Sequence, residues 1–134
     1  PETLNETLAA MLRPAANLTR RAVDRMRQDG IHGVIVNVIA DRKPAGSRGL
    51  ALHAIARSAL EAMTQAEARA AYPAGIRVFG LIAGAAPGAR RWSDIVDVIT
   101  DAANEDTLDS IAGSTLFLAS EGSNWLNGAT LAVG

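Results

Sequence analysis

Two short apolar runs, separated by one long Ala-rich segment, constrain the fold of this chain more than any other feature. Residues 33–40 and 76–83 are apolar almost throughout and lack the alternation of a half-exposed strand. Runs of this kind are typical of strands buried on both faces, as in a parallel sheet. Residues 50–72 are long enough to form the helical crossover that parallel neighbours require. We therefore expect an α/β fold.

The remaining segments predict three more helices and one more strand. Residues 3–28 carry apolar side chains at spacings of three and four, which predicts an amphipathic helix with a kink or a late start at Pro14. Asp29-Gly30 is a helix stop signal. Further helices are expected over residues 92–103 and 106–120, and a last strand over 129–133. A sheet of three strands leaves two open edges, so we interpret residues 1–134 as one domain that forms about half of a larger doubly wound sheet.

Composition and charge exclude several classes of function. The 134 residues suffice for one domain with a core, and a net charge of −1 gives no footprint for nucleic acid or an anionic membrane. The chain has no cysteine, and its two histidines, His32 and His53, lack zinc-ligand spacing. No membrane-spanning run or signal peptide is visible, so a cytoplasmic protein is expected. The chain begins at Pro1 rather than Met, which is consistent with a missing N-terminal part.

Several short segments follow one another in a recognisable order. They are Leu8–Arg13, Val34–Ala40, Ala59–Thr64, Ala74–Val78, Phe117–Ser120 and Asn127–Gly134. Together, at these separations, they resemble the C-terminal half of the short-chain dehydrogenase/reductase family. The resemblance implies a Rossmann-like doubly wound parallel sheet, of which three strands are present here.

The catalytic positions of that family hold other residues in this chain. In the family a strand ending in Asn-hydrophobic-Ser-Ser is followed, thirteen residues after the second Ser, by Tyr-x-x-x-Lys. Here Ala40 takes the Ser position, His53 lies thirteen residues further, and Arg57 follows four residues later. Met11 takes the position of the family's Asn in the preceding helix. The resemblance therefore implies degenerate positions and no catalytic residue.

These replacements change the chemistry that the positions can supply. The family's Tyr exchanges a proton with the substrate oxygen, and its Lys lowers the pKa of that Tyr and binds the cofactor ribose. Ala40 has no hydroxyl, and Met11 offers only a weak thioether acceptor. Arg57 keeps the charge, but its planar fork differs from a compact ammonium. A His53–Arg57 acid–base pair assisted by Asp41 is conceivable, since an ordinary histidine has a pKa of about 6.5. We favour the simpler interpretation of His53 as a polar residue near the start of a helix.

The family's cofactor loop is missing from the chain. No Gly-x-x-x-Gly-x-Gly or Gly-x-Gly-x-x-Gly follows a strand, so no pyrophosphate cradle is predicted. The positions equivalent to cofactor contacts in the family are Asn37, Ala83 and Gly84. We expect no cofactor for this chain alone, and NAD or NADP only if a first half of the fold exists. Substrate choice in this fold lies mainly in a loop that corresponds here to residues 84–94.

Three functional interpretations follow. The favoured one is a non-catalytic subunit or domain that acts through helix-mediated oligomerisation. Family members pair through the two helices that correspond to residues 3–28 and 50–72, so the expected partner is a second copy or a catalytic homologue. We expect Ile55, Leu60 and Met63 to supply the apolar anchors. The alternatives are an NAD(P)-dependent oxidoreductase with an atypical active site, of which this is the C-terminal portion, and a remnant without activity.

Overall fold

The computed structural model describes residues 3–41, 47–84 and 105–133. Three strands, β1 (Val34–Asp41), β2 (Arg77–Gly84) and β3 (Thr130–Val133), form a parallel sheet in the order β1-β2-β3. The helices are α1 (Leu4–Asp29), α2 (Ser47–Ala71) and α4 (Glu105–Ala119), with short 3₁₀ turns at Tyr72–Ala74 and Glu121–Leu126. The predicted α/β class and parallel sheet are confirmed. The helix expected over residues 92–103 lies outside the described residues.

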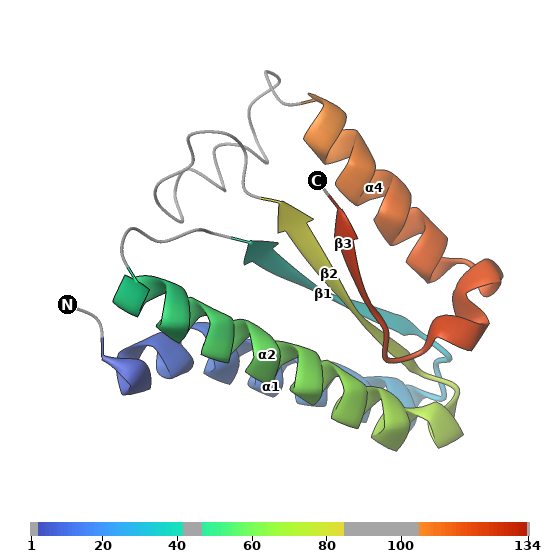
Figure 1. Ribbon diagram of the computed structural model, residues 1–134. Helices are drawn as coiled ribbons and strands as arrows, with labels where there is room; N and C mark the ends of the chain where they lie inside the picture. Colours follow the sequence, from blue (N-terminus) through green and yellow to red (C-terminus); the bar gives the residue numbers. More distant parts are fainter. Residues whose placement is uncertain (1–2, 42–46, 85–104, 134) are drawn as a thin grey trace.

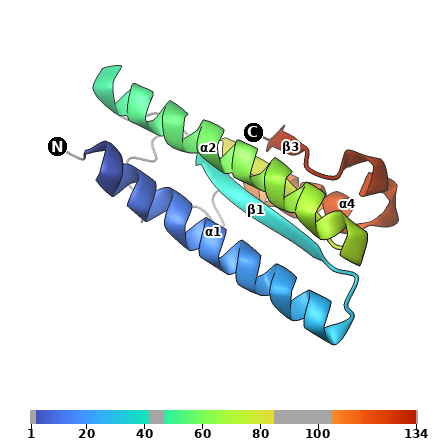
Figure 2. The ribbon, with the colours of Figure 1, turned by 90° about the horizontal axis from the view of Figure 1, so that it is seen from below.

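The sheet lies between two layers of helix. Helices α1 and α2 run side by side across one face, and α4 covers the other (Figure 1, Figure 2). The three strands point the same way, and β1 is paired with β2 from Val34 opposite Arg77 to Asp41 opposite Gly84. Strands β1 and β2 end close to the end of the molecule where α2 begins (Figure 1).

Helix α1 begins and ends where local sequence signals allow. The Thr3 side chain accepts a hydrogen bond from the Glu6 N–H at 3.3 Å, and the Thr3 N–H donates to the Glu6 carboxylate at 2.8 Å, which forms a capping box. Gly30 adopts φ 65° and stops the helix, as predicted, because left-handed backbone is easiest for glycine. The expectation of a late start at Pro14 is wrong. The helix passes through this exposed proline, held by the packing of its apolar side.

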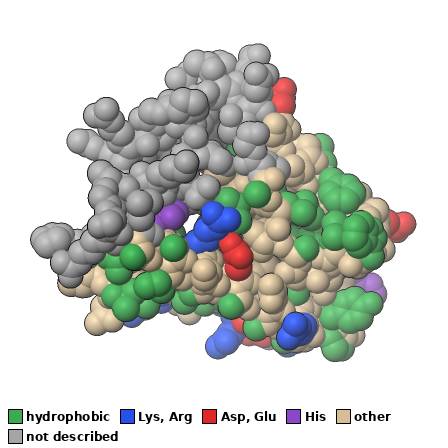
Figure 3. All heavy atoms as spheres, viewed as in Figure 1, with side chains coloured by type: hydrophobic (Ala, Val, Ile, Leu, Met, Phe, Trp, Pro, Cys, Tyr) green, Lys and Arg blue, Asp and Glu red, His purple; other side chains and the backbone are tan. Residues whose placement is uncertain are grey.

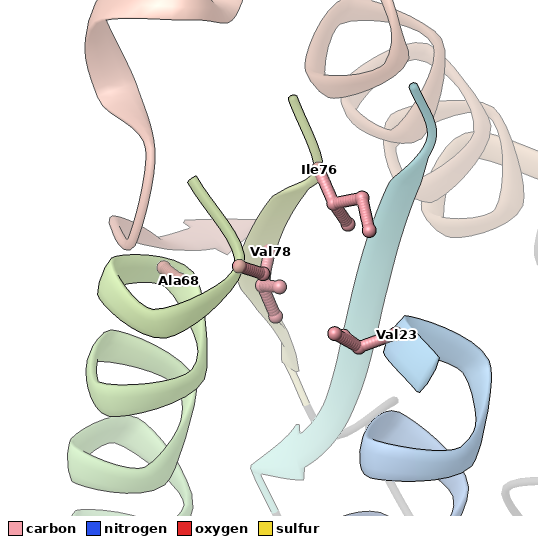
Figure 4. Close-up of a cluster of buried hydrophobic side chains, with 5 residues drawn as sticks. Val23, Ala68, Ile76 and Val78 are labelled. Carbon is pink, nitrogen blue, oxygen red and sulfur yellow. The ribbon is translucent and has the colours of Figure 1, made fainter. Parts of the chain in front are cut away.

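The apolar face of α1 and α2 buries two clusters against the sheet. Near the start of the strands, Val23 packs with Ala68, Ala71, Ile76 and Val78 (Figure 4). Nearer their ends, Ile39, Leu60 and Ile82 form a second cluster. The opposite face of the sheet buries Phe79 and Leu81 against Leu118 of α4. These clusters explain why the two apolar runs lack alternation: both faces of β2 are covered by helix.

Two polar side chains tie the end of the chain to the sheet. The Asn127 amide accepts a hydrogen bond from the Val78 N–H at 3.0 Å and donates to the Ala68 carbonyl at 3.2 Å, which joins β2 to α2. Arg77 donates to the carbonyls of Leu118 at 3.3 Å and Ser120 at 2.8 Å, near the end of α4. Such contacts satisfy carbonyls that a helix end leaves without partners.

Candidate functional site

The candidate site lies at the carboxyl edge of the sheet. In open α/β sheets, ligands bind outside the carboxyl ends of the strands. The register places Ala40 of β1 beside Ala83 of β2, and Ala83 beside Val133 of β3. This row therefore carries no polar side chain. An alanine at position 40 has no hydroxyl that could polarise a substrate carbonyl.

Met11 belongs to the core rather than to a polar site. It is partly buried in α1 and packs against the cluster of Ile39, Leu60 and Ile82. A flexible thioether fills irregular space of this kind well. The structure thus brings Met11 close to the end of β1, where it contributes apolar contact instead of the amide that the family has.

His53 and Arg57 lie one turn apart on α2, and both are half-buried. The Arg57 Nε donates to the Glu61 carboxylate at 3.1 Å, and each of these side chains is about one-third exposed. A His53–Arg57 pair assisted by Asp41 was considered from the sequence only as an alternative, and Glu61 was not identified as a partner of Arg57. The spacing of four residues between Arg57 and Glu61 was the available signal, because side chains at i and i+4 face each other on a helix.

Asn37 sits in the middle of β1, with its amide among buried threonines. It accepts a hydrogen bond from the Thr19 hydroxyl at 3.1 Å and donates to the Thr64 hydroxyl at 3.5 Å. Thr19 is 2% exposed and Thr64 is fully buried. The amide is thus engaged within the layer of α1 and α2. Neither threonine was identified from the sequence.

The part of the chain that the structure describes holds no candidate metal site and no candidate membrane-spanning helix. Across residues 3–41, 47–84 and 105–133, no three His, Cys, Asp or Glu side chains gather where they could hold a metal ion. None of the described helices is long and apolar enough to span a bilayer. The loop expected to set substrate choice, residues 84–94, lies outside the described residues after Gly84.

The fold and the position of the site define a class of protein. A parallel sheet between helical layers, with a long crossover helix beginning near the carboxyl ends of its strands, is about half of a Rossmann-like dehydrogenase fold. The family model described as "Enoyl-(Acyl carrier protein) reductase" matches residues 1–134. The chain therefore belongs to this family of short-chain dehydrogenases/reductases and corresponds to its C-terminal region.

Solved structures of the family resemble the chain over nearly its whole length. A short-chain dehydrogenase from Leptospira borgpetersenii with bound NAD⁺ is 20% identical, with a TM-score of 0.71 over 97% of this chain and 54% of its own. Sorbitol-6-phosphate 2-dehydrogenase from Erwinia amylovora is 18% identical, with a TM-score of 0.73 over 97% of this chain and 58% of its own.

A gluconate 5-dehydrogenase from Burkholderia cenocepacia, in complex with NADP and tartrate, is 25% identical, with a TM-score of 0.68 over 94% of this chain and 52% of its own. The chain thus spans little more than half the length of the solved structures it resembles. No curated protein matches it.

At this edge, two side chains at family positions that contact the cofactor make contacts within the chain. The cation at the family's ribose-binding position, Arg57, makes an ion pair with Glu61. The Asn37 amide bonds to two threonines in the helix layer.

Proposed function

We propose that this chain is a non-catalytic short-chain dehydrogenase/reductase subunit that acts by pairing with a second copy through the outer face of α2. The carrying observation is that this face is open to solvent yet almost without charge. Interface cores are depleted in charged side chains, whereas a solvated helix face is rich in them. From residue 51 to residue 70 only Arg69 is charged among the exposed positions, which are Ala51, Ala54, Ile55, Ser58, Ala62, Gln65, Ala66, Arg69 and Ala70.

Between residues 51 and 70, the other charged side chains are Arg57, Glu61 and Glu67, and each is about one-third exposed or less. Glu67 is 18% exposed and lies 3.7 Å from Arg20 of α1, so it bridges the two helices. Arg57 and Glu61 pair with each other on a half-buried part of the helix. The outer face that remains is built of small side chains around Ile55, which is 48% exposed. Small side chains let a second helix approach closely, and Ile55 supplies apolar area.

Helix α1 contributes to this surface less than expected. Leu18 is 68% exposed and Leu4 is 42% exposed, so both offer apolar surface that a partner helix could cover. The exposed part of α1 is nevertheless strongly charged, through Glu6, Arg13, Arg20, Arg21, Asp24, Arg25, Arg27 and Asp29. Charge of this density is typical of a solvated face. The proposed interface is therefore centred on α2, with α1 at its rim.

Leu60, one of the expected interface anchors, belongs instead to the core of its own chain. Leu60 is only 5% exposed and packs with Ile39 and Ile82 inside its own chain. Met63 is partly buried against the same cluster. Substituting either would damage the core of the subunit as well as any interface, so neither is a clean probe.

Ala62→Glu places a charge in the centre of the proposed interface, and Ala112→Glu makes the same change at an exposed position of α4. We expect the wild-type chain and Ala112→Glu to be dimeric by light scattering at tens of micromolar, and Ala62→Glu to be monomeric with unchanged helix content. This control also tests a rival surface, because hydrophobic side chains gather over α4 and the turn after it (Figure 3). That patch includes Leu116, Phe117 and Trp125.

If Ala112→Glu is monomeric and Ala62→Glu remains dimeric, the interface lies on the α4 side and not on α2. A wild-type chain that is folded and monomeric would contradict the proposal and favour a remnant without activity. A catalytic homologue that binds the monomer and is released by Ala62→Glu would replace the second copy as partner.

The second candidate function is an NAD(P)-dependent oxidoreductase of which this is the C-terminal portion. The open edge of β1 favours it. The Arg77 N–H donates to the Gly33 carbonyl at 3.0 Å, so by the alternation of a parallel ladder the backbone groups of Val34, Val36 and Val38 point away from β2. No described strand pairs with that edge, and Val38 is 50% exposed. Reading the gene upstream of Pro1 for a glycine-rich strand-turn-helix segment separates the two candidates.

A further inference from the structure

The polar side chains of half-buried Asn37 and of buried Thr19 and Thr64 divide the helix-covered face of the sheet into two apolar halves. Ile35 packs with the cluster around Val23 and Ile76, and Ile39 packs with the cluster around Leu60 and Ile82. Asn37 lies between Ile35 and Ile39 on the same side of β1. Its amide reaches one helix with its oxygen and the other with its nitrogen. We call these three side chains the polar layer.

Apolar contacts alone would tolerate more than one placement of these helices. Hydrophobic attraction is non-directional, so a helix shifted along the strands could still bury Val23 or Leu60 against another apolar residue. Hydrogen bonds are directional, and a shifted helix would leave the Asn37 amide or a buried threonine hydroxyl without its partner. A single buried Asn fixes the register of coiled-coil helices by the same reasoning.

We propose that Asn37 is a positioning residue that fixes α1 and α2 at one height along β1, and so fixes the shape of the outer face of α2. The inference rests on the proposed function only in that this face is taken to be the interface. It gives Asn37 a role separate from the cofactor contact expected at its family position. The role is to specify one arrangement, because an apolar layer of similar volume would stabilise the fold about as well.

The decisive comparison is between partial and complete removal of the polar layer. Asn37→Val alone leaves the buried hydroxyls of Thr19 and Thr64 without the amide, and should lower the melting temperature by about 5 °C. The triple variant Thr19→Val/Asn37→Val/Thr64→Val replaces the whole layer with apolar groups. It should recover most of that loss but give more than one set of backbone amide NMR signals for α1 and α2.

Two controls isolate the effect. Thr115→Val removes a hydroxyl that bonds at 2.7 Å only to the Ile111 carbonyl within α4, and should leave a single set of signals. Thr19→Ser/Thr64→Ser keeps both hydroxyls, and should also leave a single set. A triple variant with a single set of signals at the wild-type positions overturns the proposal. A triple variant that does not fold overturns it as well, because the layer would then serve stability rather than placement.

The test separates this proposal from the proposed function. The NMR signals report helix placement within one chain, whether or not the chain dimerises. A monomeric wild type with multiple arrangements in the triple variant would contradict the dimer and support the role of Asn37. If Ala62→Glu dissociates a wild-type dimer and the triple variant gives a single set of NMR signals, the results would support the dimer and contradict the role of Asn37.

Discussion

Arg77→Met should be among the most damaging substitutions of a charged residue in the described part of this chain. The guanidinium donates to the carbonyls of Leu118 and Ser120 and, at 2.6 Å, to the hydroxyl of Ser123. It also donates to the Ala119 carbonyl at 3.3 Å, and its carbon lies 5.8 Å from the centre of the Phe79 ring. One side chain thus joins β2 to the end of α4 and to the turn that follows it.

The magnitude follows from these contacts. Hydrogen bonds to a charged group contribute about 1.5–3 kcal/mol each, but these share one guanidinium, and exposed carbonyls recover water when it is removed. Ser123 is fully buried and keeps its bond to the Leu118 carbonyl at 2.7 Å. We therefore expect a loss of about 3 kcal/mol in the free energy of unfolding, well below the sum of the separate bonds. For a chain of this length that loss lowers the melting temperature by roughly 10 °C.

The assay is thermal unfolding followed by circular dichroism, with Arg25→Met as the matched control. Arg25 forms an ion pair with Asp29 at 2.7 Å, but its side chain is 75% exposed. Exposed pairs of this kind contribute about 0.5 kcal/mol, so the control should melt within about 2 °C of wild type. Arg77→Lys should recover only part of the loss, because an ammonium cannot match the planar fork. Equal melting temperatures for Arg77→Met and Arg25→Met would refute the reasoning.

Two further predictions concern the chemistry of the site. The purified chain should show no saturable heat with NAD⁺, NADH, NADP⁺ or NADPH in calorimetric titration, because the cofactor loop is missing and Arg57 is paired with Glu61; micromolar binding would contradict this. The variant Ala40→Ser/His53→Tyr/Arg57→Lys should remain inactive with simple carbonyls in a spectrophotometric assay, since positioning of the cofactor is a precondition for hydride transfer. Cofactor turnover by that variant would contradict this reasoning, because it would show that these three positions suffice without the cofactor loop.

The sequence predicted the order and type of the described elements because their signals are local or periodic. The β-branched runs predicted β1 and β2 to within a residue or two, and Asp29-Gly30 predicted the end of α1. The late helix start predicted at Pro14 is wrong, because the free-energy penalty for an internal proline is offset by tertiary packing that no local pattern reveals. Helix α2 begins at Ser47, three residues before the predicted start at residue 50, and the prediction is late because the glycines of this segment indicated a loop.

The site was harder to predict because its contacts join segments that are distant along the chain. The hydrogen bonds of Asn37 span 18 and 27 residues, and nothing in the local sequence marks Thr19 or Thr64 as polar residues of a core. The burial of Leu60 depends on which side of α2 faces the sheet, and an Ala-rich helix leaves that choice open. The pairing of Arg57 with Glu61, by contrast, was readable from their spacing.

The most direct test of the central claim is the distance between identical spin labels on α2 of two chains. The chain has no cysteine, so Ser58→Cys introduces a single labelling site in the middle of the proposed interface, and Ala112→Cys introduces a matched one on α4. Both labels are measured by pulsed electron paramagnetic resonance at tens of micromolar. Pairing through α2 predicts a short, narrow distance distribution for the label at position 58 and a longer one for the label at position 112. Absence of any interchain distance at position 58, or a short distance only at position 112, would contradict the account.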